Sequence, residues 1–398
     1  MGSTVNASTG LESTALDALS ELVTRFEPAD MDVPGGRARI RLDAGQAGSF
    51  DALIEGGVAR LIPASSPGSA DAILRADTEV WEEIAGDVRA GMAAYRKGRL
   101  QIRENLHLGV GFLAATSGDT DPRRLRFERV RTANHDLSIL SAGEGKPLVC
   151  IHGLGGTKAS FLPTVSALAP EGFRVICLDL PGFGDSHKPG AGSYNAPWFA
   201  GAIAELLDEL EIERAHLAGN SMGGRIAIET GLIHSDRVER MVLLSPALAW
   251  LRDRGWKWLL RMPLPQLGYL QPTPRRLVEP VVRRLVPGAN EGWTAAGVDE
   301  FMRSYLTPRG RFAFYESARR IYMDEPHGED GFWTRLRELS PDTMFVWGKQ
   351  DRLVPISFMR HVEEALPAAT HVELNCGHVP QLEAPGQTHR AMKKFLDG

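Results

Sequence analysis

The chain has 398 residues, of which 43% are hydrophobic and 24% are charged, a balance that is typical of folded proteins and excludes wholesale disorder. This length exceeds what one hydrophobic core usually supports, so we expect two domains or one domain with a large insertion. The formal net charge is -5 and no basic stripe with interleaved aromatic residues occurs, which argues against nucleic acid as a partner.

Neither a signal peptide nor a membrane-spanning segment is predicted. Glu12, Asp17 and Glu21 interrupt the apolar residues near the N-terminus, and no later apolar stretch is long enough to cross a membrane. The three cysteines lie in or beside apolar stretches and lack the spacing of metal ligands, as expected for buried thiols in a reducing compartment. We therefore expect a cytoplasmic protein with no integral membrane span, no metal site and no cofactor.

Residues 1–116 are expected to form a small α+β domain. Apolar residues at helical spacing predict an amphipathic helix over residues 11–26, and an acidic start predicts a second helix from residue 77. Short alternating segments between these helices predict the strands of one sheet, at 37–42, 50–54, 58–62 and 72–76. Turn formers and charged residues over 117–123 predict a linker.

Residues 124–398 alternate apolar strand candidates with helical segments, a pattern typical of a largely parallel sheet that is covered on both faces. The alternation stops over about 247–335, where Trp, Arg, Leu and Pro are frequent, and we expect a helical insertion there. The predicted fold class is therefore α/β, preceded by the small α+β domain. The strand candidates are 148–151, 174–180, 215–219, 241–244, 344–347 and 371–374.

Ser221 stands at the centre of the run Gly-Asn-Ser-Met-Gly, between a strand candidate and a helix candidate. A sharp turn from strand to helix holds such a serine in a strained backbone conformation and leaves no room for side chains two residues before and after it. Gly219 and Gly223 meet this requirement. The run therefore predicts a nucleophilic serine.

A nucleophilic serine needs a histidine base and a carboxylate that orients the base, and in this arrangement the acid and then the histidine follow the serine along the chain. Asp351 and His378 each follow directly on a strand candidate, at the edge of the sheet where open α/β folds bind ligands. Asp179 precedes the serine, so we expect it to fix its own loop. The sequence predicts a triad of Ser221, His378 and Asp351.

An oxyanion hole for this serine requires two backbone N–H donors, each worth about 3 kcal/mol in the transition state. Met222 follows the nucleophile and supplies the first donor, and Leu154, in the glycine-rich segment 152–156 after a strand candidate, is predicted to supply the second. Two interpretations stay open for Trp250 and Trp256 in the insertion, which could line an acyl pocket or pack the helices of the insertion on the sheet.

These residues resemble the α/β-hydrolase superfamily, in which the run from Asp179 to Ser186 also has a counterpart. The resemblance covers residues 124–398 and places 247–335 where one branch of the superfamily carries a helical cap. That branch includes lipases, monoacylglycerol lipases, carboxylesterases and carbon–carbon bond hydrolases. Its epoxide hydrolases and haloalkane dehalogenases normally use an aspartate nucleophile, so Ser221 argues against them. The resemblance implies a hydrolase without a metal or redox cofactor.

The N-terminal region resembles a sterol carrier protein type 2 domain, a small sheet with helices over an apolar tunnel. The resemblance rests on residues 70–77 with Trp81 soon after, and on residues 97–102 before a helix. The family usually has a glycine in the turn that here reads Arg-Glu-Asn at 103–105. The resemblance implies binding of a fatty acyl chain, sterol or similar lipid, and the alternative is a scaffold or dimerisation domain.

We predict that the enzyme hydrolyses a lipophilic carboxylic ester, in the manner of a monoacylglycerol lipase, and that the N-terminal domain holds the apolar substrate. The elbow at 220–224 also resembles that of carbon–carbon bond hydrolases of ring-fission products, which use the same triad, although their loop after His-Gly is longer and contains proline. This activity is the second prediction. The third is a non-catalytic lipid carrier.

Overall fold

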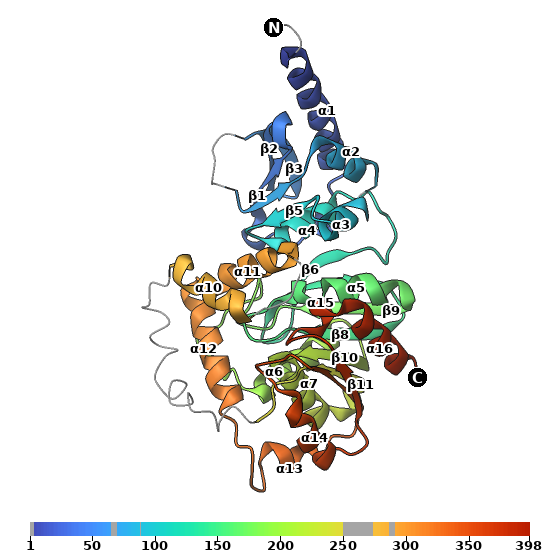
Figure 1. Cartoon of the computed structure of the whole chain (residues 1–398), viewed down its shortest axis with the longest axis vertical. Coiled ribbons are helices and arrows are strands. Elements are labelled where there is room, and N and C mark those ends of the chain that lie inside the picture. The colour runs from blue at the N-terminus through green and yellow to red at the C-terminus, as the bar shows by residue number, and fades with distance from the viewer. Residues whose placement is uncertain (1–3, 65–69, 88, 250–273, 286–290) are drawn as a thin grey trace. The chain divides into compact units, whose positions relative to one another are not determined.

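The computed structural model describes residues 4–64, 70–87, 89–249, 274–285 and 291–398. The chain divides into two compact units, each with its own sheet (Figure 1). Unit 1 comprises residues 1–128 together with 291–300, and unit 2 comprises 129–290 together with 301–398. Residues 291–300 thus belong to unit 1, although the sequence predicted them as part of the helical insertion.

Unit 1 is built on a five-stranded sheet in the order β3-β2-β1-β4-β5. Neighbouring strands run antiparallel except for β1 and β4, which pair in parallel. The four strands predicted in this region are confirmed, and β5 is a strand that the sequence did not predict. The strands are β1 (Arg37–Asp43), β2 (Ser49–Glu55), β3 (Val58–Pro63), β4 (Ala72–Arg75) and β5 (Gln101–Arg103). The helices are α1 (Thr4–Thr24), α2 (Thr78–Gly86), α3 (Arg89–Arg96) and α4 (Leu106–Ala115).

Helix α4 is buried along its whole length, because its residues are apolar on every side. Its first turn begins at Asn105, whose side chain caps the helix by accepting a hydrogen bond from a backbone N–H. Two acidic residues from the distant segment 291–300 add to this stabilisation. Asp299 accepts hydrogen bonds from Arg103, and Glu300 accepts one from the Leu106 N–H at 3.2 Å. The carboxylates lie where the positive end of the helix dipole favours negative charge.

Unit 2 contains an eight-stranded sheet in the order β13-β12-β11-β10-β8-β9-β7-β6. The strands from β13 to β9 pair in parallel, and β7 pairs antiparallel to β9. All six strands predicted in this region are confirmed, whereas β6 and β7 were not predicted. The strands are β6 (Arg126–Arg131), β7 (Asp136–Ala142), β8 (Lys146–Ile151), β9 (Phe173–Leu178), β10 (Ala215–Asn220), β11 (Val238–Leu244), β12 (Asp342–Gly348) and β13 (Thr370–Leu374).

Helices cover both faces of this sheet, with α5 and α16 on one face and α6 and α7 on the other (Figure 1). The central strands are therefore buried on both sides and consist almost entirely of apolar residues. The helices that pack on the sheet are α5 (Leu162–Leu168), α6 (Ala196–Glu209), α7 (Met222–Ile233), α14 (Met359–Ala365), α15 (Pro380–Glu383) and α16 (Pro385–Asp397). Within the described residues, the helices of the insertion are α10 (Arg275–Leu285), α11 (Glu291–Tyr305), α12 (Pro308–Tyr322) and α13 (Phe332–Leu336).

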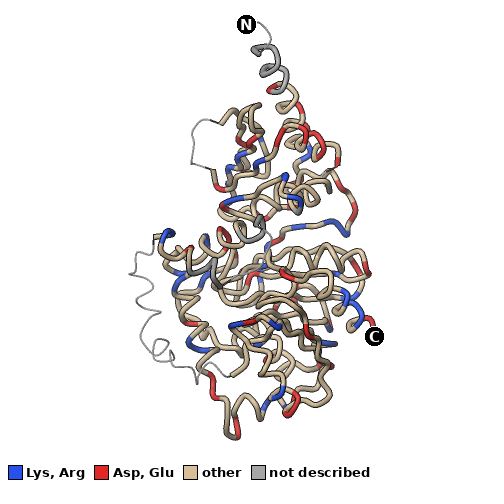
Figure 2. Tube along the Cα trace, viewed as in Figure 1, with Lys and Arg blue, Asp and Glu red and all other residues tan. Residues whose placement is uncertain are grey.

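Acidic and basic residues are interspersed along the described part of the trace in each unit (Figure 2). No helix in the described part of the chain is long and apolar enough to cross a membrane.

Candidate active site

Ser221 occupies the turn between β10 and α7, with φ 53° and ψ -115°. This is a strained conformation for a residue that carries a side chain, and such strain persists only where the surroundings enforce it. The surroundings do so here, because a Cβ atom at Gly219 would collide with the Gly223 carbonyl and a Cβ atom at Gly223 would collide with the Ile151 carbonyl. The small residues on either side of the serine are therefore required, for the reason predicted from the sequence.

His378 and Asp351 form a hydrogen-bonded pair at the ends of neighbouring strands. Asp351 follows β12, and its Oδ2 lies 2.8 Å from Nδ1 of His378, which comes after β13. The other carboxylate oxygen accepts hydrogen bonds from the backbone N–H groups of Leu353 and Val354 at 2.8 and 2.9 Å. Asp351 is thus buried with both oxygens bound, and its orientation relative to the imidazole is fixed.

The side chains of Asn220 and Glu383 hold the loop around His378 in place, a role that was not predicted for either residue. Asn220 donates its side-chain amide to the carbonyl oxygens of Leu244, at 2.9 Å, and His378, at 3.0 Å. Glu383 accepts hydrogen bonds from the backbone N–H groups on either side of His378. Asn220 directly precedes Ser221, so its amide joins the turn at Ser221 to the loop that contains His378. The structure therefore brings Ser221, His378 and Asp351 together at one edge of the sheet.

The loop that is predicted to form the oxyanion hole lies against Ser221. A Cβ atom built at Gly153 would stand 3.2 Å from Cβ of Ser221, so the backbone of this loop passes directly beside the serine. Leu154 follows Gly153 and packs against the core of unit 2. Met222 is the first residue of α7, and the N–H groups of the first helical turn have no partner within their own helix. Both predicted donor residues therefore flank Ser221.

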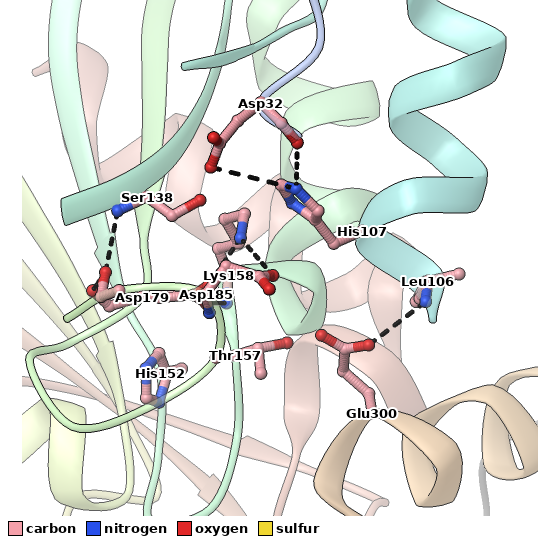
Figure 3. Close-up of polar contacts among 12 residues, drawn as sticks. Asp32, Leu106, His107, Ser138, His152, Thr157, Lys158, Asp179, Asp185 and Glu300 are labelled. Atoms are coloured by element: carbon pink, nitrogen blue, oxygen red, sulfur yellow. Dashed lines mark hydrogen bonds and ion pairs between the residues drawn. The ribbon is translucent and has the colours of Figure 1, made fainter. Parts of the chain in front are cut away.

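A buried ionic cluster supports the loops around this site, as Figure 3 shows for Lys158, Asp179 and Asp185. Asp179 accepts hydrogen bonds from the Lys158 ammonium at 2.5 Å, from the Lys158 N–H at 2.7 Å and from the Asp185 N–H at 2.8 Å. Asp185 in turn forms a bidentate ion pair with Arg303. Asp179 fixes the loop that follows β9, in agreement with its predicted role.

Burial disfavours the charged forms of Lys158 and Asp179. The attraction between their opposite charges outweighs this effect of burial. Burial alone would lower the pKa of Lys158, but the nearby carboxylates of Asp179 and Asp185 raise it. Burial likewise acts to raise the pKa of Asp179, and the ammonium of Lys158 holds this pKa below its ordinary value. Both groups therefore stay charged at neutral pH, as buried ion pairs must if they are to remain paired.

Replacement of Lys158 by methionine is expected to lower the free energy of unfolding by about 3 to 5 kcal/mol, because it leaves the Asp179 carboxylate buried without its counter-charge. Chemical denaturation would measure this loss. Lys393→Met is the matched control, since it removes an ion pair with Asp397 that lies on the surface and should leave the free energy of unfolding nearly unchanged. Equal losses in the two variants would contradict the structural role of the cluster.

Helix α12 of the insertion packs on the loops that border the site. Gly155, in the oxyanion loop, has no room for a Cβ atom because Phe301 and Phe314 lie against it, and Gly182 is packed in the same way by Ala313. The last residue of α12, Tyr322, packs against the core of unit 2, and burial raises the pKa of its hydroxyl to about 12. These aromatic residues were not identified from the sequence, since nothing local distinguishes them from ordinary core residues.

The predicted pocket residues Trp250 and Trp256 lie outside the described residues.

The model of the alpha/beta hydrolase fold family matches residues 146–385, and the chain therefore belongs to this family of hydrolase enzymes. It is 29% identical to the 2-hydroxy-6-oxononadienedioate/2-hydroxy-6-oxononatrienedioate hydrolase of Paraburkholderia xenovorans over 70% of this chain and 98% of that protein. It is 29% identical to the 2-hydroxy-6-oxo-6-phenylhexa-2,4-dienoate hydrolase of Comamonas testosteroni, over 64% of this chain and 89% of the relative.

Among solved structures, the chain resembles a bacterial membrane phospholipase A with a TM-score of 0.57 and 28% identity, over 69% of this chain and 86% of the other. The solved structure and the two sequence relatives each match only part of this chain.

Proposed function

We propose that this protein is a carbon–carbon bond hydrolase that acts on a 2-hydroxy-6-oxo dienoic acid, a ring-fission product. The observation that carries the proposal is the similarity to hydrolases named for such substrates, over nearly their whole length. This was the second of the predictions from the sequence, and the relatives favour it over the ester that was predicted first. Both proposed activities use the same catalytic triad.

In the proposed mechanism Ser221 attacks the 6-oxo carbonyl group while His378 takes the serine proton. Asp351 holds the imidazole with Nδ1 toward its own carboxylate, which leaves Nε2 to face the nucleophile. The N–H groups of Leu154 and Met222 stabilise the oxyanion. Before this attack the proton of the substrate's 2-hydroxyl group moves to C5, which gives the 2-oxo tautomer. The bond between C5 and C6 then breaks, its electron pair passes to the 2-oxo group as a dienolate, and His378 gives its proton to that dienolate. Water activated by His378 next hydrolyses the acyl group on Ser221 and restores the serine.

A lipophilic carboxylic ester is the second candidate substrate. The resemblance to a phospholipase A favours it, since that enzyme and this chain share 28% identity. The same three side chains would act on an ester, with the alcohol in place of the departing carbon. The sterol carrier protein-like domain would then hold the apolar substrate and raise its concentration near unit 2.

Direct comparison of substrates tests the proposal. Purified protein is mixed with 2-hydroxy-6-oxo-6-phenylhexa-2,4-dienoate, whose colour is lost on cleavage, and with p-nitrophenyl esters of graded chain length. We expect kcat/KM for the dienoate to exceed that for every ester by at least about 100-fold, because a pocket that pairs polar groups of its own substrate rejects analogues that lack them. A higher kcat/KM for a long-chain ester would overturn the carbon–carbon assignment and favour the second candidate.

A further inference from the structure

His152 is the first residue after β8, and its side chain is completely buried. Its Nδ1 lies 2.7 Å from the carbonyl oxygen of Gly153, and its Nε2 accepts a hydrogen bond from the backbone N–H of Leu180 at 3.0 Å. Leu180 belongs to the loop that follows β9, which pairs with β8 in the sheet. The imidazole therefore connects the loop that is predicted to form the oxyanion hole with the loop after β9.

These two partners determine where the proton of the His152 imidazole lies. A backbone N–H can only donate a hydrogen bond, so the Nε2 atom that faces Leu180 carries no proton. A carbonyl oxygen can only accept, so Nδ1 carries the proton and donates it to Gly153. The ring of Phe183 packs edge-on against the imidazole, with 5.5 Å between the ring centroids. His152 is thus a neutral side chain whose two ring nitrogens are both hydrogen-bonded.

The carbonyl oxygen of Gly153 is held by two donors. Besides Nδ1 of His152, the Gly156 N–H donates a hydrogen bond to it at 3.0 Å. A peptide unit is planar and trans, so the N–H of Leu154 points away from the Gly153 carbonyl oxygen. Within the described residues this N–H has no acceptor, which leaves it for the oxygen of a bound substrate. The two donors to Gly153 therefore set the direction of the Leu154 N–H.

The peptide unit that joins Gly153 and Leu154 lies next to the nucleophile. A Cβ atom built at Gly153 would stand 3.2 Å from Cβ of Ser221. The loop is equally close to the imidazole, because a Cβ atom at Gly156 would stand 3.5 Å from Nδ1 of His152. A donor stabilises an oxyanion only when it points at the position that the oxygen will occupy. The orientation of this one peptide unit thus decides whether the Leu154 N–H can act.

We propose that His152 is a positioning residue of the oxyanion hole, whose Nδ1–H sets the direction of the Leu154 N–H through the carbonyl group of Gly153. His152 acts through Leu154 and does not itself contact the substrate. Its effect is larger in the transition state than in the bound substrate, because negative charge develops on the oxygen only as the serine attacks. The inference rests on the proposed serine mechanism and holds for either candidate substrate.

Two substitutions of His152 separate its two hydrogen bonds. In His152→Asn the side-chain amide nitrogen can take the place of Nδ1 and donate to Gly153, while the bond from Leu180 is lost. In His152→Gln the longer side chain places its amide oxygen near the position of Nε2, where it can accept from Leu180, while the donor to Gly153 is lost. Each variant removes the ring and one hydrogen bond, so each is the control for the other, and chemical denaturation measures their stability.

We expect His152→Gln to lower kcat by about 10- to 100-fold with KM within about threefold of the wild type, whereas His152→Asn keeps kcat within about threefold. The inhibition constant of a trifluoromethyl ketone, which forms an oxyanion on the serine, should rise in His152→Gln by the factor by which kcat/KM falls. The rate constant for labelling of the serine by a fluorophosphonate should fall in the same variant, and its measurement needs no substrate.

Three results would overturn the inference. The first is a wild-type kcat in His152→Gln. The second is a loss of kcat in His152→Asn that equals or exceeds the loss in His152→Gln, which would mean that the bond to Gly153 is not the one that matters. The third is a lower kcat in His152→Gln with an unchanged inhibition constant for the trifluoromethyl ketone, which would indicate a structural role only. If the wild type is labelled by the fluorophosphonate but cleaves no dienoate, the proposed substrate class fails, and the labelling rates and an ester still test the role of His152.

Discussion

Replacement of Ser221 by alanine is expected to lower kcat by at least about 10⁴-fold, because the covalent step then has no nucleophile. Steady-state loss of the dienoate colour, or release of p-nitrophenol from an ester, measures this decrease. A fluorophosphonate should label the wild type and leave the variant unlabelled. The fold should persist, since the hydroxyl is small and the substitution leaves unchanged the close backbone packing at Gly219 and Gly223.

Ser245→Ala is a closely matched control for this change. Ser245 follows β11, is also buried, and also has a positive φ, of 45°. Its hydroxyl has no hydrogen-bond partner among the described residues. Loss of that hydroxyl should therefore leave kcat within about threefold of the wild type, as for a substitution that touches no reacting group. A Ser221→Ala variant that retained more than a hundredth of the wild-type kcat would contradict the nucleophilic role of Ser221.

The positions of Ser221, Asp351 and His378 in the fold could be predicted because each depends on local sequence. The turn at Ser221 requires glycines at fixed spacing, and the sequence shows them at 219 and 223. Asp351 and His378 each follow a strand of a parallel sheet, and the carboxyl ends of such strands share one edge. Strands β6 and β7 were not predicted, because β6 is the edge strand, β7 is its neighbour, and both carry more polar residues than the central strands.

The residues that support the reacting groups could not be predicted, because they come from distant parts of the chain. Asp324 meets Arg225 of α7 only when α12 folds over the loops of the site, and no periodicity signals that contact. Glu383 carried a weak signal, since it is an acidic residue shortly after the predicted base. The substrate was harder still to predict, because one triad serves an ester and a carbon–carbon bond alike and the choice depends on the shape of the pocket.

Replacement of Asp351 by asparagine is expected to lower kcat by about 10⁴-fold without unfolding the protein. The asparagine oxygen can still accept the hydrogen bonds from the Leu353 and Val354 N–H groups, so the loop keeps its anchor. The amide nitrogen would face Nδ1 of His378, where the carboxylate oxygen now lies at 2.8 Å. Because an amide N–H can only donate, Nδ1 must then accept, and the imidazole proton moves to Nε2. A protonated Nε2 cannot take the proton of Ser221.

Asp136→Asn serves as the control for this prediction. Asp136 begins β7 and forms an ion pair with Arg129 at 3.2 Å, at a partly exposed position. The same change of charge at that position should alter kcat by no more than about twofold, because a surface ion pair contributes little. Stability of Asp351→Asn is followed by chemical denaturation, which separates loss of catalysis from loss of structure. If a folded Asp351→Asn variant keeps more than a tenth of the wild-type kcat, the carboxylate does not set the tautomer of His378, and another group must orient the base.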